Sequence, residues 1–121
     1  MIRTYGLTHI SLAVRDIERS LRFYKQLFGA TEVYRDEGEV QLQTPGSKDV
    51  IALERRPRDA GKSAGMAHFG FRLIDARDID AAVAEVARAG GKLLRRGEFG
   101  PGQPYAYVAD PDGYEIEIWY E

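Results

Sequence analysis

The apolar residues of the chain follow one order of periodicities, and that order occurs twice. A strand pattern comes first, then a helical pattern, then three further strand patterns. The first copy spans about residues 5–56 and the second about 66–121, and the proline, glycine and charged residues of 57–65 form a linker between them. A repeat of about 60 residues is longer than a solenoid unit. The pattern therefore predicts an α+β fold in which a single domain, 1–121, contains two tandem βαβββ modules.

Each helical pattern begins at an aspartate and ends at a glycine. The first runs from Asp16 to Gly29. The second ends at Gly90 and begins at Asp75 or Asp78, either of which is a suitable N-cap. In each module the helix lies between one strand and three others. The predicted strands are 7–14, 31–35, 40–44 and 50–55, then 66–73, 92–96, 107–109 and 114–120.

Composition narrows the class of protein. Of 121 residues, 44% are hydrophobic, which is enough for a core, and the net charge of −2 gives no basic surface for nucleic acid. The chain contains no cysteine, which excludes thiolate metal sites, disulfides and thiol nucleophiles. No segment resembles a signal peptide or a membrane span. We expect a soluble cytoplasmic protein that binds neither nucleic acid nor membrane.

Strand parity separates the side chains into two faces, and the only two histidines occupy the same face. His9 and His68 occur at equivalent positions of the first strand of each module, where they alternate with large apolar residues. The apolar face packs under the helix, so the histidines lie on the opposite, more polar face. The same parity adds to this face Glu115, Glu117 and Trp119 of the last strand, and Gln41, Gln43, Tyr105 and Tyr107.

Two imidazoles and one carboxylate are a ligand set that holds a divalent metal ion and leaves positions open for substrate. Glu117 is preferred to Glu115 because residues 116–118 align with 51–53 of the first module. The hypothesis is a metal site formed by His9, His68 and Glu117, with Glu117 as the catalytic carboxylate. A solvated or packed strand explains each residue taken alone, whereas their equivalent positions on one face favour the metal.

Four short motifs in order carry a resemblance to a known family. They are Leu7-Thr8-His9-Ile10, Ser20-Leu21-Arg22-Phe23-Tyr24 with Leu27-Phe28-Gly29, Ala67-His68-Phe69, and Asp110-Pro111-Asp112-Gly113-Tyr114-Glu115-Ile116-Glu117. Over its whole length the chain resembles the vicinal oxygen chelate superfamily, which includes glyoxalases, bleomycin resistance proteins and extradiol dioxygenases. The resemblance implies a curved mixed sheet around a cavity. It also implies a divalent ion (Fe, Mn, Ni, Co or Zn) on His9, His68 and Glu117, and a small substrate bound through adjacent oxygens.

The chain departs from the glyoxalase I pattern at one position. Glyoxalase I places a fourth ligand, Glu or Gln, where this sequence has Ala52. Glu54 lies on the same face but ~6.6 Å further along the strand, so it reaches the ion only through a bulge or a register shift. Three ligands resemble the extradiol dioxygenases and fosfomycin thiol transferases instead. A metal-free antibiotic-binding protein of the bleomycin-sequestering kind and a fosfomycin-type thiol transferase stay open as alternatives.

Substrate contacts are expected from six residues on the histidine face. Tyr105, Tyr107 and Trp119 suit a flat or apolar group, although strand packing explains these aromatic residues equally well. Gln41 and Glu54 are candidates to orient the substrate or move protons, and Arg72 to meet an anionic group. The short linker and the resemblance together predict a homodimer with the site at the subunit interface, where His9 of one subunit completes the site of the other.

Overall fold

The computed structural model of the protein describes residues 1–121. Its elements in chain order are β1 (His9–Val14), α1 (Ile17–Phe28), β2 (Thr31–Arg35), β3 (Glu39–Gln43), β4 (Val50–Arg55), β5 (Phe69–Arg72), the 3₁₀ turn η1 (Ala76–Asp78), α2 (Ile79–Arg88), β6 (Lys92–Glu98), β7 (Pro104–Ala109) and β8 (Glu115–Trp119). The predicted α+β fold of two βαβββ modules is confirmed. Strands β2 and β4 have the predicted bounds, whereas β5 is shorter and β6 and β7 are longer.

The strands form two four-stranded mixed sheets of the same topology. The orders are β1-β4-β3-β2 and β5-β8-β7-β6. In each sheet the first strand runs parallel to the last strand of its module, and the other pairs are antiparallel. The first strand therefore lies at one edge of its sheet in both modules, beside the strand that follows the proline turn.

The helices begin and end where their capping residues predict. The Asp16 carboxylate accepts a hydrogen bond from the Arg19 amide, and Gly29 adopts the left-handed conformation (φ 67°) that closes α1. Asp75, not Asp78, supplies the side-chain cap of the second helical segment, because its carboxylate accepts from the Arg77 amide and Asp78 makes no such bond. Asp75 thus begins the 3₁₀ turn with a side-chain cap, and Asp78 stands at the N-cap position of α2 without one.

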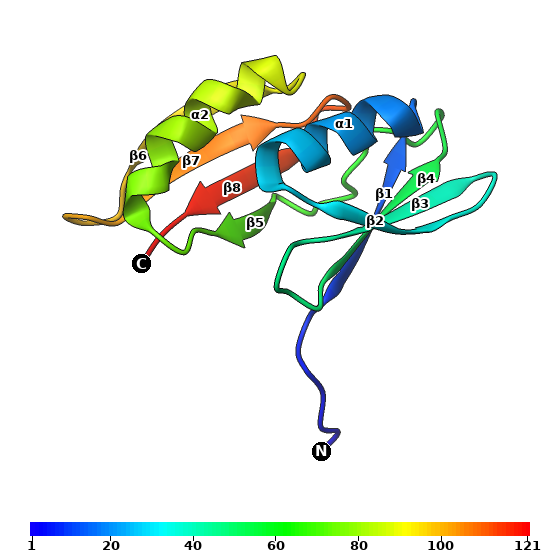
Figure 1. Ribbon diagram of the computed structural model, residues 1–121, viewed down its shortest axis with the longest axis horizontal. Coiled ribbons are helices and arrows are strands. Elements are labelled where there is room, and N and C mark those ends of the chain that lie inside the picture. The colour runs from blue at the N-terminus through cyan, green and yellow to red at the C-terminus, as the bar shows by residue number, and fades with distance from the viewer.

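The apolar side of each strand builds the core, as the parity predicted. Members of this set in the central strands include Val40, Leu42, Leu53, Val108, Ile116 and Ile118, all fully buried. The core continues from one module to the other through α1. Phe28 of α1 stacks on Phe71 of β5 with ring centroids 3.8 Å apart. Phe23 of α1 lies close to Gly91 of the second module, and a β-carbon added at Gly91 would stand 2.5 Å from the Phe23 ring. Figure 1 shows α1 and α2 on the same side of the molecule.

The Asp-Pro-Asp-Gly turn before β8 binds α1 through two buried carboxylates. Asp112 accepts hydrogen bonds from the Arg19 guanidinium (2.9 Å), the Ser20 hydroxyl (3.2 Å) and the Arg15 amide (3.2 Å). Asp110 accepts from the Tyr24 hydroxyl at 2.7 Å. Burial of charge without partners is costly, so these donors are what makes the two carboxylates tolerable. The turn therefore fastens the second module to the helix of the first.

The N-terminal residues 1–8 extend away from both sheets (Figure 1). They include exposed apolar side chains, Ile2, Tyr5 and Leu7. Neither helix has the length and the apolar composition needed to cross a membrane.

Candidate functional site

His68 and Glu117 form a pair on the face of the second sheet that turns away from α2. His68 directly precedes the edge strand β5, and Glu117 is the central residue of the neighbouring strand β8. The imidazole Nε2 lies 3.1 Å from a carboxylate oxygen of Glu117. The imidazole is 35% exposed and the carboxylate 13%, so the pair is partly shielded from water yet open to a ligand.

Tyr107 borders this pair from strand β7. It stands directly across from Glu117 in the β7–β8 register, and its ring meets the His68 ring edge-on at 5.1 Å. Burial, the charge of Glu117 and a hydrogen bond to that carboxylate raise the pKa of the Tyr107 phenol. Tyr107 is therefore protonated at ordinary pH and acts as a hydrogen-bond donor. The Arg95 guanidinium lies 4.0 Å from the centre of the Tyr107 ring and forms an ion pair with Glu115 at 2.6 Å.

Three more of the expected substrate residues share this face. Tyr105 pairs across the sheet with Trp119, and Trp119 pairs with Arg72 of β5. The Arg72 guanidinium lies 5.5 Å from the Trp119 ring and donates to the main-chain oxygen of Glu121. The residues expected from the second module thus surround the His68–Glu117 pair.

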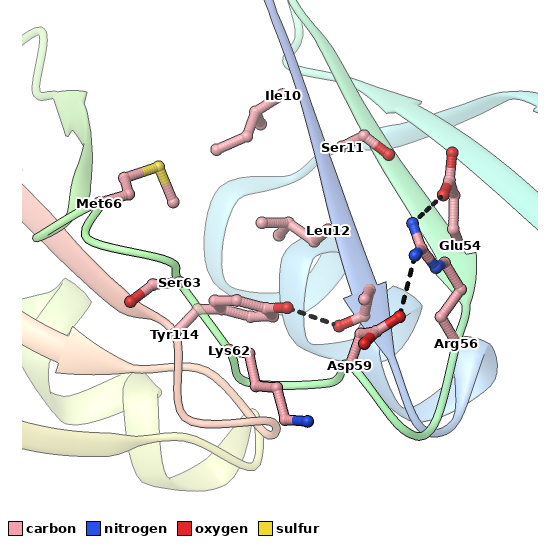
Figure 2. A pocket seen from close by; sticks show the side chains of 11 residues that line it. Ile10, Ser11, Leu12, Glu54, Arg56, Asp59, Lys62, Ser63, Met66 and Tyr114 are labelled. Atoms are coloured by element: carbon pink, nitrogen blue, oxygen red, sulfur yellow. Dashed lines mark hydrogen bonds and ion pairs between the residues drawn. The ribbon is translucent and has the colours of Figure 1, made fainter.

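Gln41 and Glu54 lie on the other sheet. Gln41 donates to Glu39 at 3.2 Å, next to it on the same face of β3. Glu54, in β4, lies 3.8 Å from Arg56, which also binds Asp59 at 2.9 Å. Figure 2 shows this charged group at one side of a pocket of about 530 Å³, into which Ser11 and Met66 also face.

His9 lies apart from the His68–Glu117 pair within one chain. It is exposed at the start of β1, and both histidines line an open groove of about 560 Å³ between the edge strands β1 and β5. No group of three His, Asp or Glu side chains in the chain is arranged to hold a metal ion. One chain therefore assembles two of the three residues that strand parity selected.

Ala52 occupies in the first module the position that Glu117 occupies in the second. Ala52 pairs with Ser11 on one side and Gln41 on the other, just as Glu117 pairs with Gly70 and Tyr107. Strand β4 keeps a continuous register with both neighbours, because the only irregularities lie in the β2–β3 and β6–β7 pairs. Glu54 is consequently not shifted toward the position of Ala52.

Two features of this region were not predicted from the sequence. Phe99, which follows β6, stands 4.6 Å from the Tyr105 ring and extends the aromatic surface. Arg95 is held by Glu115, so the carboxylate that was rejected as a ligand has a structural partner. Side-chain alternation along β6 would assign Arg95 to one face of the sheet, but a bulge between Leu93 and Arg95 breaks that alternation. The face of Arg95 could therefore not be predicted from the sequence.

The sequence matches the Glyoxalase/Bleomycin resistance protein/Dioxygenase superfamily over residues 6–118. The chain belongs to this superfamily. It is similar to catechol-2,3-dioxygenase of Bacillus subtilis, with 28% identity over 93% of the chain and 41% of that protein. It is 32% identical to lactoylglutathione lyase of Neisseria meningitidis, over 93% of the chain and 88% of the relative. These relatives are enzymes, and the protein is an enzyme of the superfamily.

Solved structures of other proteins share the fold. The fosfomycin resistance protein FosX from Mesorhizobium loti superposes with a TM-score of 0.80 at 23% identity, covering 98% of this chain and 94% of that one. The chain spans less than half the length of the Bacillus dioxygenase, so that protein's activity is not transferred as a whole.

Proposed function

We propose that the protein is a metal-dependent enzyme whose divalent ion is held by His68 and Glu117 of one chain and His9 of a second chain. The observation that carries the proposal is the 3.1 Å separation of His68 Nε2 and Glu117. Two ligands about 2.0–2.2 Å from one ion lie roughly 3–3.5 Å from each other, so this pair fits two neighbouring ligand positions. A neutral imidazole and a carboxylate are also donors that such ions accept.

The location of His9 supports a site shared between two chains. His9 lies outside the pair within one chain, on the edge strand of a sheet whose polar face is open. A two-fold dimer that sets the first module of one chain over the second module of its partner would supply the third ligand twice. Such a dimer would also enclose the substrate between two sheet faces.

The ion, when bound, would supply positions for two adjacent substrate oxygens and stabilise negative charge that develops on them. The residues of this chain then orient the substrate and move protons. Glu117 would supply the one negative charge among the three ligands, which offsets part of the ion's charge, and it is the candidate proton acceptor. Tyr107, protonated at ordinary pH, orients Glu117 through its hydroxyl. Gln41 and Glu54 of the partner's facing sheet are candidates to contact the substrate from the other side.

We infer that the reaction differs from that of the Neisseria lyase. The resemblance to glyoxalase I implies a fourth ligand where this chain has Ala52, and the unbroken register of β4 keeps Glu54 away from that position. An open position on the ion suits a reaction in which the substrate, or a small co-substrate, enters the coordination shell.

Metal analysis of protein purified without a histidine tag tests the proposal. Wild-type protein should contain close to one divalent ion per chain, and His68→Ala and Glu117→Ala should lose it. Glu115→Ala is the matched control, because Glu115 lies on the same strand as Glu117 but pairs with Arg95 of β6. Wild-type protein that folds, dimerises and binds no divalent ion would instead identify a metal-free binding protein.

Mixing two inactive variants tests whether the site is shared. In a dimer of one His9→Ala chain and one Glu117→Ala chain, a shared arrangement leaves one of the two sites with all three ligands intact. A site built within one chain leaves none. Recovery of metal content after unfolding and refolding the mixture therefore supports the shared site, and no recovery contradicts it.

A further inference from the structure

Aromatic side chains form a continuous row on the face of the second sheet. The ring centroids of Phe99 and Tyr105 are 4.6 Å apart, those of Tyr105 and Tyr107 are 5.6 Å apart, and Tyr107 meets His68 at 5.1 Å. Trp119 flanks Tyr105 in the adjacent strand. We call Phe99, Tyr105, Tyr107 and Trp119 the aromatic row. It leads from an exposed end at Phe99 to the His68–Glu117 pair.

Two glycines allow the outer rings to lie against the sheet. A β-carbon at Gly97 would stand 2.6 Å from the Tyr105 hydroxyl, and one at Gly70 would stand 3.2 Å from the Trp119 indole nitrogen. Covering a glycine with an aromatic ring stabilises a sheet, and this accounts for two of the four rings. It does not account for Phe99, which is 55% exposed although it contacts Tyr105. An exposed phenylalanine that continues a row toward a ligand pair is typical of a binding surface.

Two cations and two carboxylates lie along the aromatic row. Arg95 lies over Tyr107 and is paired with Glu115 at 2.6 Å, while Arg72 lies over Trp119 and donates to a main-chain oxygen. The second carboxylate is that of Glu117, beside His68. A ligand that covers the row therefore finds a flat apolar surface flanked by charges of both signs, with no excess of cations that would select an anion.

We propose that the aromatic row binds the flat, uncharged aromatic part of the substrate and sets its position relative to the His68–Glu117 pair. As a substrate assignment the proposal rests on the proposed function, but the row itself binds without a metal. Offset and edge-on stacking with a planar ring supplies the affinity. A saturated ring of the same size covers similar area but lacks the flat π-face, so shape distinguishes the two.

The single tryptophan gives a specific signal for the test, since the chain has one indole N–H. The full-length protein is titrated with 2-naphthol, with the saturated analogue decahydro-2-naphthol and with 2-naphthoate, as purified and after treatment with a chelator. Two-dimensional NMR follows the Trp119 indole resonance. We expect 2-naphthol to bind with the same affinity in both samples, and more tightly than the other two compounds.

Two pairs of variants locate the binding surface. Gly97→Ala keeps every ring but displaces Tyr105, and Gly38→Ala is its control because a β-carbon there meets nothing within 4 Å. Phe99→Leu keeps apolar area but removes the ring, and Tyr34→Leu is its control at a similarly exposed tyrosine of the first module. Gly97→Ala and Phe99→Leu should each weaken 2-naphthol binding by about 2- to 10-fold, and the controls should not.

Each other outcome contradicts a defined part of the proposal. If decahydro-2-naphthol binds as tightly as 2-naphthol, the aromatic row does not require a flat ring. If 2-naphthoate binds more tightly than 2-naphthol, the row selects anions. Binding that depends on the metal assigns the contact to the ion. Glu117→Ala separates this proposal from the proposed function, because loss of metal with retained 2-naphthol binding leaves the aromatic row in place. Retained metal in that variant overturns only the ligand assignment.

Discussion

The hydroxyl of Tyr24 in α1 donates a 2.7 Å hydrogen bond to the carboxylate of Asp110, which lies 86 residues later in the chain. Both groups are buried. The other Asp110 oxygen accepts from the amides of Asp112 and Tyr114 at 2.9 and 3.0 Å. One carboxylate thus holds the turn before β8 and attaches that turn to the helix of the other module.

Substitutions at this contact should separate hydrogen bonding from charge. Tyr24→Phe leaves one Asp110 oxygen without a donor and should lower the free energy of unfolding by about 1.5–3 kcal/mol. Asp110→Ala removes the acceptor of all three donors and should cost about 3 kcal/mol or more. Urea unfolding at pH 7 measures both. Tyr34→Phe is the control, since it removes an exposed hydroxyl bonded to Asp36. An equal loss in this control would contradict the assignment.

The pH dependence of stability should reveal the burial of Asp110. Burial is the main cause of the raised pKa of this carboxyl, and its hydrogen bonds only partly oppose the rise. The stability that this group contributes is therefore full below its ordinary pKa of 3.8 and is lost as the pH rises through the higher folded value. Asp110→Asn keeps the shape and cannot ionise, and its amide can donate to the Tyr24 oxygen.

The measurement is the difference in urea midpoint between wild type and Asp110→Asn from pH 3 to pH 8. Wild type should lose stability relative to the variant as the pH rises above 3.8, and the difference should then level off. A difference that is independent of pH would show that the hydrogen bonds fully offset burial, and one of opposite sign would show that they outweigh it.

Gly91 should not tolerate a side chain. An added β-carbon would stand 2.5 Å from the Ala109 carbonyl oxygen and 2.5 Å from the Phe23 ring. Gly91→Ala should therefore destabilise the protein by about 1–3 kcal/mol through overpacking. Gly38→Ala, where the space is open, should be neutral or stabilise by up to about 1 kcal/mol. Thermal unfolding of the two variants checks this, and equal melting temperatures would rule out the close contact.

Substitutions at Ala52 and Glu54 should distinguish a site with three protein ligands from one with four. Ala52 is fully buried, on the same face as His9 of the adjacent strand. Ala52→Glu should destabilise the metal-free protein by about 2 kcal/mol or more, because it buries a carboxylate. Metal should reverse the loss, and the added anionic ligand should tighten metal affinity by about tenfold or more.

Glu54→Gln should leave metal affinity unchanged, because β4 has no bulge that brings Glu54 toward the ion. Calorimetric titration of both variants with the native metal decides between three and four protein ligands. Weaker binding in Glu54→Gln, combined with no gain in Ala52→Glu, would identify Glu54 as the fourth ligand.

Local signals in the sequence predicted most of the fold. Asp16 and Gly29 specify the ends of α1, because a side-chain cap and a left-handed residue depend only on neighbouring residues. The period of two assigned His68, Glu117 and Tyr107 to one face, and the structure places them in contact. Parity assigns faces well because adjacent strands keep their side chains in register.

Distances between elements were not predictable in the same way. Parity placed His9 on the polar face but carries no information about how the two sheets are oriented, so parity alone does not separate it from His68 and Glu117 within one chain. Only the short linker and the family resemblance led us to expect a site shared between chains. In the sequence the Asp-Pro-Asp-Gly motif carries the family resemblance, but its hydrogen bonds to α1 were not predicted. Its partners, Ser20 and Tyr24, are about 90 residues away, and no local pattern joins them.

The position of α1 leads us to expect that the two similar modules unfold as a single cooperative unit. Its apolar face is divided between them, since Phe28 stacks on Phe71 and Phe23 packs at Gly91. If the chain were cut in the linker, the first half would expose part of the apolar face of α1. The second half would expose the carboxylates of Asp110 and Asp112, which are buried in the whole protein. Heat or denaturant should accordingly melt both halves in one transition. Two copies that look interchangeable in the sequence therefore have different roles, since one supplies the helix and the other covers part of its apolar face, and we expect neither to fold in the absence of the other.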